Sequence, residues 1–262
     1  MTCRQSPDPL LLLEEWLGSP LGRELAARES ACLQRMLADV FGYYLLQVGM
    51  VASYGDAAAS CPVRHRILLP LSTRAQTLGI QVVAAPDRLP VAGDSVDAVI
   101  LPHTLDFVDD ARQVLREVER VLIPEGRVLV VGFNAVSLWG LWGLIRGGKG
   151  RVPWCGRFLT PFRVADWLSL LGFDVEQQEV MMFCPPWPRA LLQRLSFVEP
   201  MGRRFWPPLG GVYAIRAVKR VSTLTPLRPS WKSRRPVLHG GAVEPSPRRI
   251  APRGSDRLPS GT

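Results

Sequence analysis

The sequence lacks the features that would place it in a membrane or on the secretory route. Its longest apolar run, AVSLWGLWGLI (135–145), is well short of the roughly 18 residues that a membrane-spanning helix needs. Near the start, DPLLLLEEWL breaks into Glu14 and Glu15 after four leucines, which is too short for a secretory signal. These absences predict a cytoplasmic protein without a transmembrane segment.

Cysteine and histidine are too scattered to suggest a metal centre. The five cysteines form no C-x-x-C pair and no cluster with the three histidines at zinc spacing. We therefore expect no metal site, and we expect reduced structural thiols. The cysteines are Cys3, Cys32, Cys61, Cys155 and Cys184.

The body of the chain also lacks an excess of positive charge. The formal net charge is +9, but residues 219–262 hold ten Lys or Arg and two acids, which gives +8. Residues 1–218 hold 22 basic and 21 acidic residues, which gives +1, whereas nucleic-acid binding calls for a basic groove. The proline-rich tail has no hydrophobic periodicity, which predicts a disordered, solvated terminus rather than a basic arm for nucleic acid or anionic lipid.

The chain does contain regular alternation of strand and helix patterns, which predicts a parallel α/β sheet. Ser19 and Pro20 mark the start of an amphipathic helix over 20–40, and a second helix is predicted over 109–122. Thr160, Pro161 and Gly172 delimit a third. The short apolar runs that predict strands are 43–49, 65–69, 80–85, 96–101, 127–133, 173–183 and 210–220.

One continuous segment, residues 89–133, carries a specific order of motifs. Leu89-Pro90 is followed by Asp97 before a strand, then by Arg120-Val121-Leu122 at the end of a helix. A turn at Pro124 to Gly126 leads into a further strand from Arg127. This order closely resembles the class I S-adenosylmethionine-dependent methyltransferases of the small-molecule type (methyltransferase type 11-like), and the resemblance extends more weakly over 41–218.

The resemblance implies a fold and a cofactor. The fold is a doubly wound, mostly parallel, Rossmann-like sheet of seven strands whose last strand is antiparallel. We accordingly expect an N-terminal helical lid over 1–42, a methyltransferase-like α/β domain over 43–218 and a disordered basic tail over 219–262. The implied cofactor is S-adenosyl-L-methionine, bound beyond the carboxyl ends of the strands.

The cofactor motifs of the family are degenerate in this chain. Gln47 stands where the family has an acid, Gly49 keeps the first glycine of the loop, and Val51 and Ser53 replace the next two. The second strand is followed by Leu69-Pro70-Leu71 in place of a ribose-binding carboxylate, and Ala85 maps to an adenine-reading aspartate. The implied cofactor-binding residues are Gln47, Gly49, Val51, Ala85, Asp87, Arg88 and His103.

Two interpretations follow from this degeneracy. In the first, the protein is a methyltransferase that acts on a small, lipophilic acceptor and binds its cofactor weakly through an unusual pocket. In the second, the fold is catalytically degenerate and serves as a binding or regulatory module. We favour the enzyme, because methyl transfer from a sulfonium depends chiefly on positioning, which varied residues can supply.

Three further features are candidates for function. His103, after the fourth strand, is either a general base or positioning group, with Asp106 orienting it, or a cap on the strand end. Asn134, Trp139 and Trp142 form a lid over a lipophilic acceptor, a peripheral membrane contact or part of a core helix. The insertion over 184–208 carries a short amphipathic helix at 189–195 that rests on a bilayer, covers the acceptor site or caps the sheet edge. The sequence does not indicate the oligomeric state.

Overall fold

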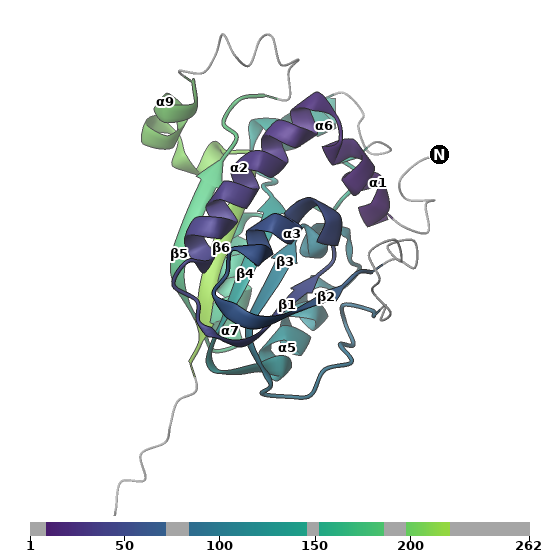
Figure 1. Ribbon diagram of the computed structural model, residues 1–262. Coiled ribbons are helices and arrows are strands. Elements are labelled where there is room, and N and C mark those ends of the chain that lie inside the picture. The colour runs from purple at the N-terminus through teal and green to yellow at the C-terminus, as the bar shows by residue number, and fades with distance from the viewer. Residues whose placement is uncertain (1–8, 72–83, 146–151, 186–197, 221–262) are drawn as a thin grey trace, which may run out of the picture. The chain divides into compact units, whose positions relative to one another are not determined.

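The computed structural model describes residues 9–71, 84–145, 152–185 and 198–220, which centre on a six-stranded sheet of order β2-β1-β3-β4-β6-β5 (Figure 1). The first four strands in the chain run parallel, and β6 lies antiparallel between β4 and β5. The strands are β1 (Gly42–Val48), β2 (Val63–Leu69), β3 (Val96–Pro102), β4 (Leu122–Phe133), β5 (Phe173–Met181) and β6 (Val212–Lys219).

Both faces of the sheet are buried, because successive side chains of its central strands alternate between two apolar cores. In β1, Leu45 belongs to the core beneath α1 (Pro9–Leu17), α2 (Pro20–Leu37) and α3 (Val51–Ala59). Its neighbour Leu46 belongs to the core beneath α5 (Ala111–Val121) and α7 (Pro161–Leu170). Figure 1 shows α2 and α3 in front of the sheet and α5 and α7 behind it.

Three of the described helices begin where a short polar side chain satisfies free backbone amides. Ser19 caps α2 by accepting from Gly22, and Asp110 caps α5 by accepting from Arg112 and Gln113. Thr160 caps α7 in the same way. The remaining helices of the described part are α4 (Thr104–Phe107), α6 (Leu138–Ile145), α9 (Val198–Phe205) and a short 3-10 helix (Pro207–Leu209).

A buried arginine fastens the end of α2 to the sheet. Arg216 of β6 donates to the Met36 carbonyl at 2.7 Å and to the Asp39 carboxylate at 2.9 Å, and its side chain is only 6 % exposed. On its other side it donates to Glu176 of β5 at 2.7 Å. The N-terminal helical layer is therefore held by a polar anchor in addition to its apolar face.

The predicted fold is confirmed in its main features. The sheet is doubly wound and its last strand is antiparallel, whereas β1, expected at the centre, is the second strand from one edge of the described sheet. Most of the strand expected at 80–85 lies outside the described residues, as do the tail and the short helix expected at 189–195. No helix in the described ranges is long and apolar enough to cross a membrane.

Two details differ from the expectations. Strand β4 begins at Leu122 rather than at 127, and the expected turn falls inside it as an irregularity with Glu125 at φ +64°. Cys155 is disulfide-bonded, so the expectation of reduced thiols is wrong at this position. Cys32, Cys61 and Cys184 are buried and free of disulfides.

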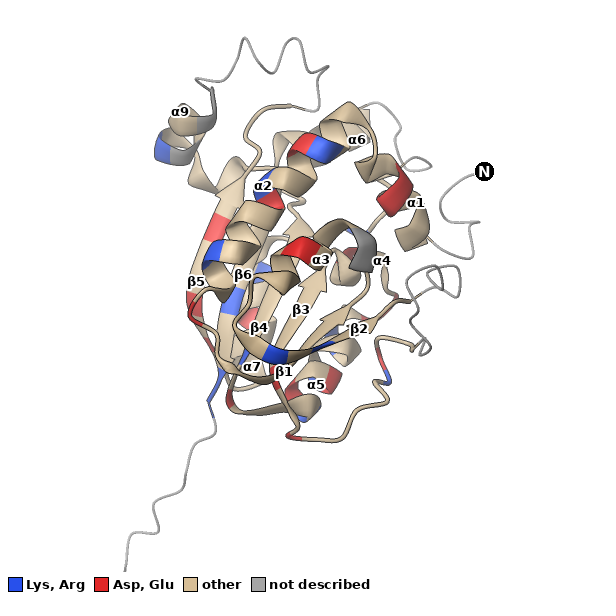
Figure 2. Ribbon diagram, in the orientation of Figure 1, with Lys and Arg blue, Asp and Glu red and all other residues tan. Residues whose placement is uncertain are grey.

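Charge is mixed over the surface of the described elements. Figure 2 shows basic and acidic residues interspersed along α2 and over the neighbouring elements. Several of these charges form surface pairs, such as Arg35 with Glu179 at 2.7 Å. This distribution agrees with the near-zero net charge counted for residues 1–218.

Candidate functional site

The carboxyl ends of β1, β3 and β4 meet at one edge of the sheet, which is where open α/β folds bind their ligands. The Gly49 amide donates to the Leu69 carbonyl at 2.9 Å, and the His103 amide donates to the Val131 carbonyl at 2.8 Å. The Thr104 hydroxyl donates to the Val48 carbonyl at 2.7 Å. These bonds extend the sheet into the loops that carry the predicted site residues.

His103 lies at this edge in a fully buried polar cluster. Its imidazole Nδ1 lies 3.0 Å from Asp106 Oδ2, and its Nε2 lies 3.1 Å from Glu29 Oε1 of α2. The Tyr54 hydroxyl of α3 donates to the other oxygen of Glu29. His103 precedes α4 with φ +53°, in the left-handed region, so the backbone itself turns the ring toward both carboxylates.

The two carboxylates determine the charge of His103. Burial works against a charged imidazole, but Glu29 and Asp106 outweigh it and raise the pKa of His103 to about 9. Burial also raises the pKa of Asp106, against the lowering effect of His103. At neutral pH the cluster therefore contains an imidazolium held between acidic side chains.

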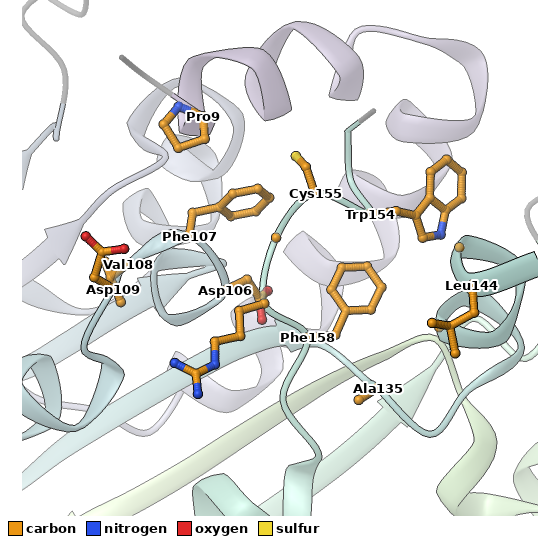
Figure 3. A pocket seen from close by; sticks show the side chains of 14 residues that line it. Pro9, Asp106, Phe107, Val108, Asp109, Ala135, Leu144, Trp154, Cys155 and Phe158 are labelled. Atoms are coloured by element: carbon orange, nitrogen blue, oxygen red, sulfur yellow. The ribbon is translucent and has the colours of Figure 1, made fainter. Parts of the chain in front are cut away.

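A cavity of about 860 Å³ opens beside this cluster, at the ends of β3 and β4 (Figure 3). Asp106 lines it and links it to the cluster, and the figure shows the Asp106 side chain between Phe107 and Phe158. The described lining residues are Pro9, Asp106, Phe107, Val108, Asp109, Ala135, Gly140, Gly143, Leu144, Trp154, Cys155, Gly156, Arg157 and Phe158.

Aromatic rings connect the cavity wall to His103. The Phe158 ring stacks on Phe133 with centroids 4.9 Å apart, and Phe133 in turn lies 4.2 Å from the His103 ring. The Trp154 indole is fixed by a hydrogen bond of 2.9 Å from its Nε1 to the Trp139 carbonyl. Aromatic side chains therefore form part of the cavity wall and pack against the His103 cluster.

One wall of the cavity is formed by the segment over 152–158 together with α4. The Arg157 amide donates to the Asp106 carbonyl at 2.6 Å, which fastens the segment over 152–158 to the α4 turn. Gly156 lies so close to Phe107 that an added Cβ would come within 3.0 Å of the ring. The loop and the helix are thus packed together around Asp106.

Gly49, the retained glycine of the cofactor loop, has a packing reason to be glycine. Its φ is +105°, and a Cβ at this position would lie 2.6 Å from the Thr104 hydroxyl oxygen. The space that a side chain would fill is occupied by the loop after β3. Glycine at this position is therefore required by the fold, whether or not a cofactor binds.

Gln47 is the predicted cofactor residue with the clearest unused binding capacity. Its side chain is fully buried, and its amide Nε2 donates to the Met50 carbonyl at 2.7 Å. Its Oε1 has no hydrogen-bond partner among the described residues. A buried acceptor without a partner at the end of β1 fits a ligand that brings a hydrogen-bond donor.

The other predicted cofactor residues lie on two loops. Val51 begins α3, directly after the β1 turn. Ala85 and Arg88 are exposed, Asp87 is half-buried, and the Arg88 amide donates to the Ala85 carbonyl at 3.0 Å to form a turn. None of the predicted cofactor residues lines the 860 Å³ cavity.

The lid interpretation is wrong for Asn134 and Trp139, which are core residues. Trp139 is fully buried and donates to the Cys184 carbonyl at 2.8 Å. Asn134 is also buried and donates to the Pro208 and Gly210 carbonyls. Trp142 is half-buried, and the outer face of α6 exposes Leu141 and Leu144 instead.

Sequence reasoning missed Glu29 and Tyr54. The signal for Glu29 was present, because it is a single acid on the apolar face of α2 that also contains Leu25, Cys32 and Met36. A charged side chain at such a position needs a buried partner. The identity of that partner, His103, depends on the packing of α2 across the sheet edge and has no local signal.

Comparison with known proteins agrees with this architecture. The sequence model of the methyltransferase domain matches residues 66–130. A Thermotoga maritima structure, described as an S-adenosylmethionine-dependent methyltransferase and possible histamine N-methyltransferase, superposes with a TM-score of 0.57 at 21% identity, covering 74% of this chain and 89% of that one. An S-adenosylmethionine-dependent methyltransferase from Archaeoglobus fulgidus gives 0.55 at 18% identity, covering 81% and 100%. This chain belongs to the class I S-adenosylmethionine-dependent methyltransferase family.

The similar sequences include proteins that are themselves uncharacterized. The chain is 34% identical to YafS of Escherichia coli over 169 residues, which are 64% of this chain and 68% of YafS. It is 28% identical to Mb2026c of Mycobacterium bovis over 181 residues, which are 66% of this chain and 61% of that protein. The family is therefore established by these comparisons, whereas the methyl acceptor is not.

Proposed function

We propose that this protein transfers a methyl group from S-adenosylmethionine to a small, largely apolar acceptor bound in the 860 Å³ cavity. The observation that carries the proposal is the position of the cavity at the carboxyl ends of β3 and β4 in a methyltransferase fold. Its aromatic walls suit an apolar molecule, and the near-neutral body of the chain favours a small acceptor over nucleic acid.

The residues at the end of β1 are the ones that would hold the cofactor. The unpartnered Oε1 of Gln47 accepts a hydrogen bond from the bound molecule, and Asp87 supplies the acidic group that the second and third strand ends lack. When bound there, the cofactor supplies an electrophilic methyl group on a sulfonium. Because several contacts of the family are replaced, we expect weak binding.

His103 acts in this proposal as a positioning residue. Its side chain is fully enclosed, so it does not contact a molecule in the cavity, and it acts through Asp106, a lining residue whose own side chain is also enclosed. The imidazolium and the Phe133 amide both bind Asp106 Oδ2, at 3.0 and 2.9 Å. These two bonds fix the carboxylate at the wall of the cavity, and its other oxygen, Oδ1, is buried and has no hydrogen-bond partner among the described residues.

The alternative function is that of a binding or regulatory module on a methyltransferase fold. The replacements at Val51, Ser53 and Ala85 favour it, because each removes a feature of the family's cofactor site. The packing role of Gly49 also favours it, since this glycine does not need a cofactor to explain its presence. The cytoplasmic location of the protein is a prediction for both the enzyme and the binding module.

The proposal is tested with cofactor carrying a radiolabelled methyl group. The protein is incubated with this cofactor and a bacterial small-molecule extract, and label is counted in the organic-soluble products. We expect label to appear with the wild-type chain and to fall at least about tenfold with Asp106→Asn, whereas Asp166→Asn, which removes an exposed carboxylate of α7, has little effect. Absence of transfer, together with absence of cofactor binding, would favour the binding module.

A further inference from the structure

Two helices at the carboxyl end of β4 expose apolar side chains to solvent. In α6, Trp139 and Gly143 face the core, and leucines repeat at intervals of three residues on the exposed side of the helix. Large apolar side chains are also exposed in α9 and directly after it. We call these exposed residues the α6–α9 surface, and they are Val136, Leu138, Leu141, Leu144, Ile145, Met201, Phe205 and Trp206.

The two helices flank one short segment of the chain. The Trp139 indole of α6 donates to the Cys184 carbonyl at 2.8 Å. Gly202 of α9 packs so closely on Phe183 that an added Cβ would lie 2.5 Å from the Phe183 side chain. Figure 1 accordingly shows α6 and α9 at the same end of the sheet. Exposed apolar side chains that gather in this way mark an interaction site, whereas singly scattered ones do not.

The sequence places positive charge beside this surface. The segments that carry the two helices, 134–158 and 184–208, together contain eight basic residues and one acid, which gives +7. Residues 1–218 carry +1 in total, so the remainder of that range carries −6. Two of the basic residues, Arg203 and Arg204, lie within α9 itself. Exposed apolar side chains next to basic residues suit an anionic lipid surface, which attracts the charges and buries the apolar groups.

We propose that the α6–α9 surface docks on a bilayer that contains anionic lipids. Its apolar side chains enter the interfacial region, and the negative remainder of the body is repelled, which sets the orientation of docking. A second copy of this chain is a poorer occupant, because a self-complementary contact would bring two segments of net positive charge together.

The docking surface adjoins the cavity. Leu144 belongs to the α6–α9 surface and also lines the 860 Å³ cavity, together with Gly140 and Gly143 of the same helix. Docking therefore places the cavity next to lipid, where an apolar acceptor is concentrated. This consequence rests on the proposed function, whereas the docking itself does not.

Flotation of the full chain with vesicles tests the proposal without cofactor or acceptor. We expect vesicles of phosphatidylcholine mixed with phosphatidylglycerol to bind the chain at least about tenfold more tightly than vesicles of phosphatidylcholine alone. Equal binding to both kinds of vesicle, or binding to neither, would overturn the proposal.

A pair of matched double variants locates the contact. Leu141→Gln with Ile145→Gln removes apolar surface from α6 without changing its charge, and we expect at least about tenfold weaker binding to the mixed vesicles. Phe41→Gln with Leu170→Gln removes side chains that are also exposed, before β1 and at the end of α7, and should bind as wild type does. All three chains contain the basic tail over 219–262. Equal binding by all three would therefore assign the contact to the tail or another face, and the proposal would fail.

The charge of α9 is tested separately. We expect Arg203→Gln with Arg204→Gln to weaken binding to the mixed vesicles at least about fivefold, because each arginine near an anionic surface contributes to the attraction. Binding to phosphatidylcholine alone should not change. An unchanged affinity for the mixed vesicles would contradict the proposed orientation.

The same proteins distinguish the other outcomes. If the wild-type chain does not float with vesicles but forms a dimer that Leu141→Gln with Ile145→Gln dissociates, the surface is a contact between copies and the proposal is wrong. If the chain docks on vesicles but transfers no methyl group, the docking stands and the proposed function fails. Methyl transfer by a chain that binds no vesicle would leave the proposed function and remove this inference.

Discussion

At the scale of single residues, the buried cluster of Glu29, Tyr54, His103 and Asp106 is the most specific feature of this chain. Buried charges are tolerated when they are paired and hydrogen-bonded, and three of these side chains come from separate elements, namely α2, α3 and the β3 end. The cluster therefore forms only when the N-terminal helices α2 and α3 pack against the sheet.

The first prediction concerns the pH dependence of stability. The folded-state pKa of His103 is about 9, above the ordinary value of 6.5, so the native state holds one more proton than the unfolded state between these values. The free energy of unfolding should thus decrease as pH rises through this interval, by up to about 1.4 kcal/mol per pH unit. Chemical denaturation at several pH values checks this.

The matched variant for this measurement is His103→Gln. Glutamine retains hydrogen-bonding capacity but cannot be protonated, so its free energy of unfolding should change much less between pH 6.5 and 9. An equal slope in wild type and variant would show that another group causes the dependence.

The second prediction concerns Gly49. Gly49→Ala places a Cβ against the Thr104 hydroxyl at a φ of +105°, so we expect destabilisation on the order of 1–3 kcal/mol without any ligand present. The double variant with Thr104→Ala should recover the steric part of this cost but not the backbone part. If Gly49→Ala is as stable as wild type in thermal melting, the packing role of Gly49 is wrong.

At the scale of elements, α2 is held to the sheet by one buried and one exposed ion pair, which permits a matched comparison. The Arg216 side chain is 6% exposed and donates to the end of α2. The Arg35 side chain, which pairs with Glu179, is 58% exposed. Both pairs connect α2 to the β5–β6 half of the sheet. Burial is the main difference between them.

The third prediction follows from this difference. Arg216→Met should cost on the order of 2–3 kcal/mol, because it removes several charged hydrogen bonds from a buried position. Arg35→Met should cost less than about 1 kcal/mol, since exposed pairs contribute little. Denaturant titration of both variants gives the comparison, and similar costs would mean that Arg216 is not the anchor described here.

At the scale of the whole molecule, the fold could be predicted because its signals are local. Strand-like apolar runs, helix caps such as Ser19 and Thr160, and the ordered motifs over 89–133 each depend on neighbouring residues. The site was only partly predictable. His103 and Asp106 are three residues apart in sequence and were identified together, but Glu29 lies 74 residues away from His103.

Positions that look alike in sequence also acquired different roles from their packing. Trp139 and Leu141 lie on the same short apolar helix, yet Trp139 is buried in the core and Leu141 is 51% exposed. The composition of that helix could not distinguish these outcomes, because every residue in it is apolar or glycine. Likewise, the glycine pattern alone indicated a cofactor loop at Gly49, whereas the contact with Thr104 is visible only in the structure.

The central claim is that the chain retains a cofactor site at the end of β1, and calorimetric titration with S-adenosylmethionine and its demethylated product tests it most directly. We expect weak but saturable binding to the full wild-type chain, reduced at least about tenfold in Gln47→Met, which keeps the side-chain volume but removes the unpartnered Oε1. Arg35→Met serves as the control and should bind as wild type does. Absence of heat at millimolar ligand, in a protein shown to be folded, would contradict the claim.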